Sequence, residues 1–331
     1  CDDVDADLCA RGELRCDAVT GGTVCVGDTA SEEICNFIDD DCDGVIDNGI
    51  DVLTDITNCG GCGVVCPAPG PECVDGACYR TYWVDTAGDD INGTGAENNP
   101  WRTLTHAVRE VPPMDAIAGV PRARIYARPG RYSADPALGD AAESFPLRLR
   151  DTIQLVGFGQ ATDVIIDGGT LQNPAARPGG GELIAVVDMP DENNLLANVT
   201  LRNGGQNPRF STIFVSASQD LILQDLRTNF NVADVIIEGA SANNAYPVLI
   251  AHDARVKLER VTVRNNVGRG ARSLILSTAS EMVVENCWFN NNDVGLQSAY
   301  GIIRASAGEL RVSNSVFVDN EGNSIQFDDG A

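Results

Sequence analysis

The sequence predicts an all-β protein in which a parallel β-solenoid follows a small cysteine-rich module. Two observations lead to this prediction. Short segments rich in Val, Ile and Leu recur along the second half of the chain, and eleven of the twelve cysteines lie within residues 1–78. We therefore expect two domains, an acidic cysteine-rich module at 1–78 and a solenoid at 79–331.

Charge separates the same two parts of the chain. The 331 residues carry a formal net charge of −25, and residues 1–78 hold 18 acidic side chains against two basic ones. Nucleic acids and anionic membrane surfaces are bound by Lys and Arg, so we expect neither as a partner. The sequence also has no stretch of the roughly 20 apolar residues that a transmembrane helix needs.

The cysteine-rich module has few aromatic residues and apolar runs, so it cannot bury much surface. Small segments of this kind depend on disulfides or metals to fold. The lone Cys59-Gly-Gly-Cys62 pair, with no His in the region, does not match a zinc site. We expect structural disulfides and a secreted, extracellular or outer-membrane surface location in a bacterium. The candidate cysteines are Cys9, Cys16, Cys25, Cys35, Cys42, Cys59, Cys62, Cys66, Cys73 and Cys78.

The odd number of cysteines in the module leaves one without a partner there. Cys287 could be that partner, or a flanking cysteine could be missing. Alternatively, Cys1 could be a lipid anchor, because a matured bacterial lipoprotein begins with a lipidated cysteine. Such an anchor would leave ten cysteines for five bridges, and it is the only membrane attachment that we expect.

The most specific motif is an acidic loop, Cys35-Asn-Phe-Ile-Asp-Asp-Asp-Cys-Asp-Gly-Val-Ile-Asp47. Oxygen ligands fall at positions 1, 3, 5, 7 and 9 of an EF-hand-like frame, namely Asp39, Asp41, Asp43, the Val45 carbonyl and Asp47. Gly44 stands at position 6, where the chain of such a loop turns sharply. Four carboxylates this close repel one another without a cation, so we predict bound calcium.

The ligand set of the acidic loop is incomplete. Position 12 is Ile50, so the bidentate Glu of an EF-hand is missing. Asp40, Asp51, water or another loop would have to complete the set. Cys35 and Cys42 bracket the loop and could staple it. A solvated acidic turn without metal is the alternative interpretation.

The acidic loop resembles the metal-binding module of MopE-type bacterial surface proteins, through Glu33-Ile-Cys-Asn-Phe-Ile-Asp-Asp-Asp-Cys-Asp-Gly-Val-Ile-Asp47. The following motif, Asn58-Cys-Gly-Gly-Cys-Gly-Val-Val-Cys66, is similar to one that accompanies this module in secreted myxobacterial proteins. Phe37 departs from the family, which usually has Gly there. The resemblance implies a secreted metal-binding module, and the carboxylates favour calcium over copper, which prefers imidazole or sulfur.

The solenoid is predicted from segments that share one register. They are Asn198-Val-Thr-Leu-Arg-Asn203, Asp225-Leu-Arg-Thr-Asn229, Arg260-Val-Thr-Val-Arg-Asn265, Asn286-Cys-Trp-Phe-Asn290 and Asn314-Ser-Val-Phe-Val-Asp319. The recurrence of such segments is typical of a parallel β-solenoid, in which Val, Ile and Leu of each coil point inward and Asn stands at the corners. A β-sandwich would need hairpin turns every 8–12 residues. Cys287 aligns with Leu226, Val261 and Ser315, which predicts a buried core residue.

A capping helix is predicted near residues 100–111. Asn99 can serve as its N-cap and Pro100 as its first residue. The helical spacing of Trp101, Leu104, Val108 and Val111 makes one apolar face. Such a helix would cover the unpaired strand edges at the start of the solenoid.

The opening of the second domain is similar to pectate-lyase-like domains of the DUF1565 type. The similarity rests on Tyr82-Trp-Val-Asp-Thr-Ala-Gly-Asp-Asp-Ile-Asn-Gly-Thr-Gly95, Asn99-Pro-Trp-Arg-Thr-Leu-Thr-His-Ala-Val108 and Arg124-Ile-Tyr-Ala-Arg-Pro-Gly-Arg-Tyr132. This resemblance implies that the solenoid is a right-handed parallel β-helix. A fold alone does not supply an activity.

The sequence favours an extracellular or cell-surface structural or binding protein, a rigid β-helix carried by a calcium-stabilised, disulfide-bonded module. A second copy bound end to end, or a surface polysaccharide, is the expected partner. The alternative is a polysaccharide lyase, a glycoside hydrolase or a carbohydrate-binding β-helix. Only His252-Asp253 with Arg255 and Lys257 has mixed acid–base character, and its position between predicted strands favours a solvated turn. We therefore assign no catalytic residue.

Overall fold

The computed structural model divides the chain into two compact units, Cys1–Arg80 and Thr81–Ala331. Each unit is described by itself. The structure describes residues 13–17, 19–26, 31–41, 43, 45–68, 70–112, 122–149, 153–168, 184–187, 194–204, 212–216, 228–238, 240, 248–268, 273–294 and 301–328.

Unit 1 is held together by disulfides and by two antiparallel hairpins. Strand β1 (Glu13–Cys16) pairs with β2 (Thr23–Val26), and β3 (Pro71–Val74) pairs with the start of β4 (Ala77–Val84). The disulfides found among the described residues are Cys35–Cys62, Cys59–Cys73 and Cys66–Cys78. These bridges confirm the prediction of a disulfide-rich N-terminal region.

Two cysteine predictions need correction. Cys35 is bonded to Cys62, so it does not staple the acidic loop with Cys42. Cys16 is an exposed free thiol, and the hairpin register places it opposite Thr23 rather than opposite Cys25. The predictions for Cys1, Cys9 and Cys42, and for the side chain of Cys25, lie outside the described residues.

Unit 2 is built from three parallel sheets. Sheet I begins with the part of β4 that belongs to unit 2, residues 81–84. It continues with β5 (Arg122–Ala127), β8 (Ile153–Gly157), β11 (Leu195–Ala197), β14 (Thr228–Ala233), β17 (Ala254–Glu259), β20 (Glu281–Glu285) and β23 (Glu309–Ser313). Sheet II contains β6 (Gly130–Ser133), β9 (Val164–Asp167), β12 (Thr200–Arg202), β15 (Ile236–Glu238), β18 (Thr262–Arg264), β21 (Trp288–Asn290) and β24 (Val316–Val318). Sheet III contains β7 (Leu147–Leu149), β10 (Ile184–Val187), β13 (Ile213–Ser216), β16 (Leu249–His252), β19 (Ile275–Thr278), β22 (Gly301–Ser306) and β25 (Asn323–Asp328).

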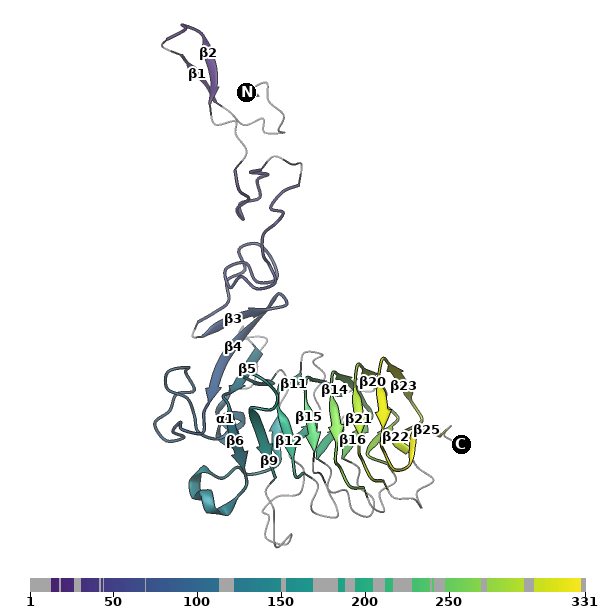
Figure 1. Cartoon of the computed structure of the whole chain (residues 1–331). Helices are drawn as coiled ribbons and strands as arrows, with labels where there is room; N and C mark the ends of the chain where they lie inside the picture. Colours follow the sequence, from purple (N-terminus) through teal and green to yellow (C-terminus); the bar gives the residue numbers. More distant parts are fainter. Residues whose placement is uncertain are drawn as a thin grey trace, which may run out of the picture. The chain divides into compact units, whose positions relative to one another are not determined.

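Each coil of unit 2 runs from sheet III to sheet I to sheet II, and the coils succeed one another from teal to yellow in Figure 1. The corners are made by single residues with positive φ, which let the chain change direction within one residue. After the sheet I strands these residues are Asn198, Asp234, Arg260, Asn286 and Asn314. Asn and Asp tolerate this left-handed conformation better than other non-glycine residues. The Asn-rich sequence pattern is therefore the pattern of the corners.

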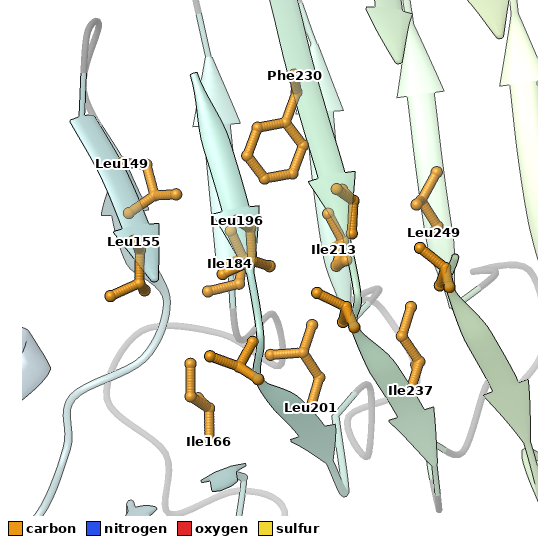
Figure 2. Packing of buried hydrophobic residues seen from close by; sticks show 14 of the residues in the cluster. Leu149, Leu155, Ile166, Ile184, Leu196, Leu201, Ile213, Phe230, Ile237 and Leu249 are labelled. Carbon is orange, nitrogen blue, oxygen red and sulfur yellow. The ribbon is translucent and has the colours of Figure 1, made fainter. Parts of the chain in front are cut away.

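The core consists of stacked rows of apolar side chains that come from all three sheets. Along sheet II the row is Tyr132, Ile166, Leu201, Ile237, Val263 and Phe289, all at most 2 % exposed. Figure 2 shows the equivalent side chains of successive coils pointing into the interior between the sheets. Each fully buried side chain of this size contributes about 1.5–3 kcal/mol. The rows thus explain why one β-rich segment repeats in the sequence.

A ladder of asparagine side chains runs through the last described coils. Asn266 Nδ2 donates to Asn292 Oδ1 at 3.0 Å, and Asn292 Nδ2 donates to Asn320 Oδ1 at 2.8 Å. Asn266 and Asn292 are at most 1 % exposed, so their amides depend on these bonds and on backbone carbonyls. The ladder fixes the register of one coil on the next.

The predicted register is wrong for one repeat segment, residues 225–229. The position shared by Val199, Val261, Cys287 and Ser315 is filled in the third coil by Val235, not by Leu226. Thr228 and Asn229 instead begin β14, where they pair with Ala254 and Arg255 of β17. Cys287 is 2 % exposed within the core, as predicted, and burial raises the pKa of its thiol.

The capping helix α1 spans Leu104–Glu110 and starts later than predicted. Its N-cap is Thr103, whose side chain accepts a hydrogen bond from His106 N, so the prediction of Asn99 as N-cap is wrong. Trp101 N donates to Trp83 O at 3.1 Å in a parallel bridge, which keeps residue 101 extended. Leu104, Ala107 and Val108 form the buried face. A 3-10 helix, η1, follows at Pro136–Ala141.

Replacing Ser277 by Ala is expected to stabilise unit 2. Ser277 is 1 % exposed, and its Oγ has no hydrogen-bond partner among the described residues. Ala251 and Ala305 occupy the same row in the adjacent coils, so alanine fits the space. We expect urea unfolding to show a gain of about 1 kcal/mol, because a desolvated hydroxyl is removed.

Ser280→Ala is the matched control for this change. Ser280 is equally buried, but its hydroxyl donates to Thr278 O at 2.8 Å and accepts from Ala254 N at 3.1 Å. Its removal is expected to lower the free energy of unfolding. Equal losses in both variants would contradict the assignment of Ser277 as an unsatisfied group.

Candidate metal centre in unit 1

Three carboxylates converge at the acidic loop, two from the loop itself and one from the residues before it. Glu33 Oε1 accepts hydrogen bonds from Asp40 N at 2.5 Å and from Asp41 N at 2.8 Å, which draws Glu33 against the next carboxylates. One oxygen each from Glu33, Asp39 and Asp41 lies within 4.8 Å of the others. The Cys35–Cys62 disulfide anchors this segment to the following loop. We call Glu33, Asp39 and Asp41 the carboxylate cluster.

The cluster has the electrostatic character of a cation site. Desolvation, together with the negative charges of Asp43, Glu33 and Asp39, raises the pKa of Asp41. Glu33 Oε2 is enclosed and receives no hydrogen bond from the described residues. An enclosed carboxylate oxygen without a donor is poorly stabilised unless a cation approaches it. The oxygen-only donor set fits a hard divalent cation such as calcium.

The other predicted ligands have different partners in this structure. Asp43 Oδ1 accepts from Val45 N at 2.8 Å, and Asp43 Oδ2 accepts from Asn48 Nδ2 at 2.6 Å. Asp47 Oδ1 accepts from Asn36 N at 3.0 Å. The structure therefore brings Asp39 and Asp41 together with Glu33, and it uses Asp43 and Asp47 to close turns. Gly44 lies outside the described residues.

A pocket of about 510 Å³ opens beside the carboxylate cluster. Glu33 and Asp41 contribute to its wall, together with Asp51, Asp55 and Asn58. The pKa of Asp51 is lowered, mainly by the hydroxyl hydrogen bond of Thr54, and the pKa of Asp55 is lowered by hydrogen bonds from Thr57. Both carboxylates therefore stay charged, so the wall of the pocket is strongly negative.

A group of cysteines is excluded as a second metal site. One sulfur each from Cys59, Cys66 and Cys78 lies within 4.8 Å of the others. All three are disulfide-bonded, Cys59 to Cys73 and Cys66 to Cys78. Metals bind thiolates, and a disulfide has none to offer. The preference of the sequence for disulfides over zinc agrees with this geometry.

Sequence reasoning missed Glu33. It precedes Asp39 by six residues and so lies outside the twelve-residue frame in which ligands were sought. It reaches the cluster because the chain turns back between them, with Ser31 N donating to Asp40 O at 2.8 Å. The sequence does contain a signal for this ligand, because Glu33 is an acidic residue just before Cys35, the first cysteine of the acidic loop.

The mixed acid–base residues of unit 2 lie close to acidic side chains at the surface. His252 Nδ1 lies 3.0 Å from Asp253 Oδ2, and Lys257 Nζ lies 2.9 Å from Glu259 Oε2. Hydrogen bonding to Glu259 raises the pKa of Lys257, which keeps its ammonium group charged and unsuited to act as a base. Their side chains are 42–47 % exposed, apart from Glu259 at 29 %. The prediction of a turn between strands holds only for Asp253: His252 ends β16, and Arg255 and Lys257 lie on the solvent-facing side of β17.

A match to a family model supports the fold of unit 2. Residues 186–331 match the family model described as right handed beta helix region, so the solenoid is a right-handed parallel β-helix. Two crystal structures of a GH136 lacto-N-biosidase from Eubacterium ramulus are similar at 10 % and 9 % sequence identity, with TM-scores of 0.27 and 0.22. The first similarity covers 76 % of this chain and 67 % of that chain, and the second covers 76 % and 68 %. No curated protein sequence matches the chain.

Two further observations concern location. In the part of the chain that the structure describes, no helix has the length and hydrophobicity to cross a bilayer. Disulfides are typical of proteins outside the cytosol, and three of them join cysteines that the structure describes in unit 1.

Proposed function

We propose that this chain is an extracellular or cell-surface protein in which a calcium-binding, disulfide-bonded N-terminal unit precedes a β-helix with a structural or binding role. The convergence of Glu33, Asp39 and Asp41 carries the calcium part of the proposal. The disulfides support the extracellular location. The paired charges on the outer face of the β-helix support a scaffold rather than a catalyst.

Calcium fits the carboxylate cluster better than other metals. It takes six to eight oxygen ligands in flexible geometry, so three carboxylates can be supplemented by backbone carbonyls and water. Copper and zinc prefer imidazole and thiolate, which the cluster lacks. Asp43, the Val45 carbonyl and Asp47 would join the ligand set only after their turn hydrogen bonds rearrange. Glu33 takes the role of the Glu that Ile50 cannot fill.

Bound calcium would stabilise unit 1 by two routes. It would cancel part of the mutual repulsion in a segment with 18 acidic and two basic side chains. A ligand that binds only the folded state also raises stability by mass action, about 2.7 kcal/mol at one hundred times its dissociation constant. The disulfides and the metal would thus take the place of a large hydrophobic core, since the buried apolar cluster among the described residues of unit 1 consists of Cys59, Cys66 and Cys73.

Calcium titration of the full chain tests the proposal. We expect binding at the carboxylate cluster, and we expect Glu33→Gln to weaken the affinity at least about tenfold, because it removes one charged ligand. Asp75→Asn is the matched control, since Asp75 is an exposed acidic residue of the same unit that lies in the β3–β4 turn. The calcium affinity of the Asp75→Asn variant should equal that of the wild type. Unchanged affinity in Glu33→Gln would contradict the assigned cluster.

A further inference from the structure

The chain contains three Asn-Gly pairs, at 48–49, 92–93 and 203–204, and the structure describes all of them. In such a pair the backbone nitrogen of Gly can attack the side-chain amide carbon of Asn, because Gly has no Cβ to block the approach. The attack needs a free Gly amide, room for the chain to bend and access for water. These requirements separate the three pairs.

The pair Asn48-Gly49 meets all three requirements. Gly49 is exposed in a turn at φ +70°, and no atom beyond its chain neighbours lies within 4 Å of the place where a Cβ would stand. Its amide makes no hydrogen bond to the described residues. Asn48 and Gly49 both belong to the wall of the pocket beside the carboxylate cluster, so water reaches them.

The other two pairs are protected by their surroundings. Gly93 N donates to Asp89 O at 2.9 Å, and a Cβ on Gly93 would collide with the same oxygen. Gly204 is buried, and a Cβ there would collide with the side chain of Thr212. Attack at either glycine therefore requires local unfolding, which costs free energy that the exposed turn of Gly49 does not need.

We propose that Asn48 is a site of spontaneous deamidation that matures the calcium site of unit 1. Gly49 N forms a bond to Asn48 Cγ, and the Cγ–Nδ2 bond breaks as Nδ2 leaves with the amide proton of Gly49 as ammonia. Water then opens the resulting succinimide ring at either carbonyl and leaves an aspartate or an isoaspartate at position 48. Nothing is oxidised or reduced, and water is the only co-reactant.

This change releases a predicted calcium ligand. Asn48 Nδ2 donates to Asp43 Oδ2 at 2.6 Å, a bond that holds Asp43 in its turn. A carboxylate at position 48 cannot donate, so it repels Asp43 instead. It also adds one negative charge to the pocket wall that contains Glu33 and Asp41.

Both effects favour a divalent cation, because a cation offsets the repulsion between neighbouring carboxylates. The maturation of the site rests on the calcium binding proposed above. The deamidation itself does not, since it depends only on the turn at Asn48-Gly49.

Peptide mapping by mass spectrometry tests the modification. The full chain is incubated at mildly alkaline pH, and the mass gain from replacing the amide nitrogen by oxygen is measured at each Asn-Gly pair. We expect Asn48 to react at least about tenfold faster than Asn92 and Asn203, which wait for local unfolding. In urea with reduced disulfides the three rates should become similar, because the protection is structural. Equal rates in the folded chain would overturn the proposal.

Calcium titration tests the consequence. Asn48→Asp carries the product side chain from the start, and it should bind calcium about three- to tenfold more tightly than fresh wild type, because the number of charged ligands tunes the affinity of such sites. Asn48→Gln is the matched control, since its longer side chain keeps the amide but closes a ring far more slowly. Its affinity should stay constant during the incubation, while that of the wild type rises.

The two measurements separate the modification from the metal site. Unchanged affinity in Asn48→Asp would overturn the role of position 48 in calcium binding, whatever the mass measurement shows. A chain that deamidates at Asn48 but binds no calcium in any form would contradict the calcium site itself and leave the modification site standing.

Discussion

Replacing Phe289 by Ala is expected to lower the free energy of unfolding of the β-helix by about 3–5 kcal/mol. Phe289 is fully buried on β21 and stacks on Phe317, with ring centroids 4.5 Å apart and an interplanar angle of 5°. It also lies over Val263 of the preceding coil. Its removal opens a cavity between stacked coils, which cannot close without shifting the strands of three sheets. Urea unfolding followed by far-UV circular dichroism measures the loss.

The neighbouring Trp288→Ala variant is the control for this prediction. Trp288 lies on the same strand but points outward and is 48 % exposed. Because it contributes little buried surface, we expect a change below about 1 kcal/mol. Equal losses in the two variants would contradict the alternation of inward and outward residues on β21.

The free energy of unfolding should depend on pH through the ionisation of Glu143. This residue is 5 % exposed and accepts hydrogen bonds from Leu104 N at 2.7 Å and Thr105 N at 2.8 Å at the start of α1. Burial raises its pKa from 4.5 to about 7, with a further contribution from Asp90, although the hydrogen bonds of Thr105 and Leu104 oppose the shift. Between these two values the folded state holds a proton that the unfolded state has released.

Stability should therefore fall as the pH rises. The contribution of Glu143 is fully present below pH 4.5 and is lost as the pH rises through about 7. The total effect is on the order of 3 kcal/mol. We expect Glu143→Gln, which cannot ionise, to flatten the dependence of the unfolding free energy on pH between 5 and 8.

Glu110→Gln is the control for the pH experiment. Glu110 lies at the exposed end of the same helix, so its replacement should leave the slope of the wild type unchanged. A Glu143→Gln variant with the full wild-type slope would show that other groups cause the pH dependence.

The sequence was sufficient to predict the architecture because a solenoid repeats one local pattern. Inward Val, Ile and Leu recur along the described coils together with left-handed corner residues that are mostly Asn or Asp, so several copies support the same interpretation. The predicted register failed for the segment 225–229: its described residues Thr228 and Asn229 begin β14, and the shared inward position is filled by Val235. Composition alone could not separate the two registers, since only strand pairing fixes which residues face inward.

The candidate metal centre could be predicted only in part. Asp39 and Asp41 were recognised because their spacing fits a local loop. Glu33 was missed, since its place in the cluster depends on hydrogen bonds to the amides of Asp40 and Asp41. The pairing of Cys35 with Cys62 was equally out of reach, because ten cysteines allow very many connectivities. The predicted start of helix α1 was wrong for a similar reason. Trp101 forms a parallel bridge with Val84, a residue that is distant from it in the sequence.

Hydrogen exchange of the full chain with and without calcium tests the central claim most directly. We predict that calcium slows exchange at the amides of Asp40 and Asp41, because both donate to Glu33 in the carboxylate cluster. Exchange in the β-helix strands of unit 2 should stay unchanged and serves as the internal reference. Protection confined to Val45 and Asp47, or no calcium-dependent protection in residues 31–41, would contradict the assignment of Glu33, Asp39 and Asp41 as the calcium site.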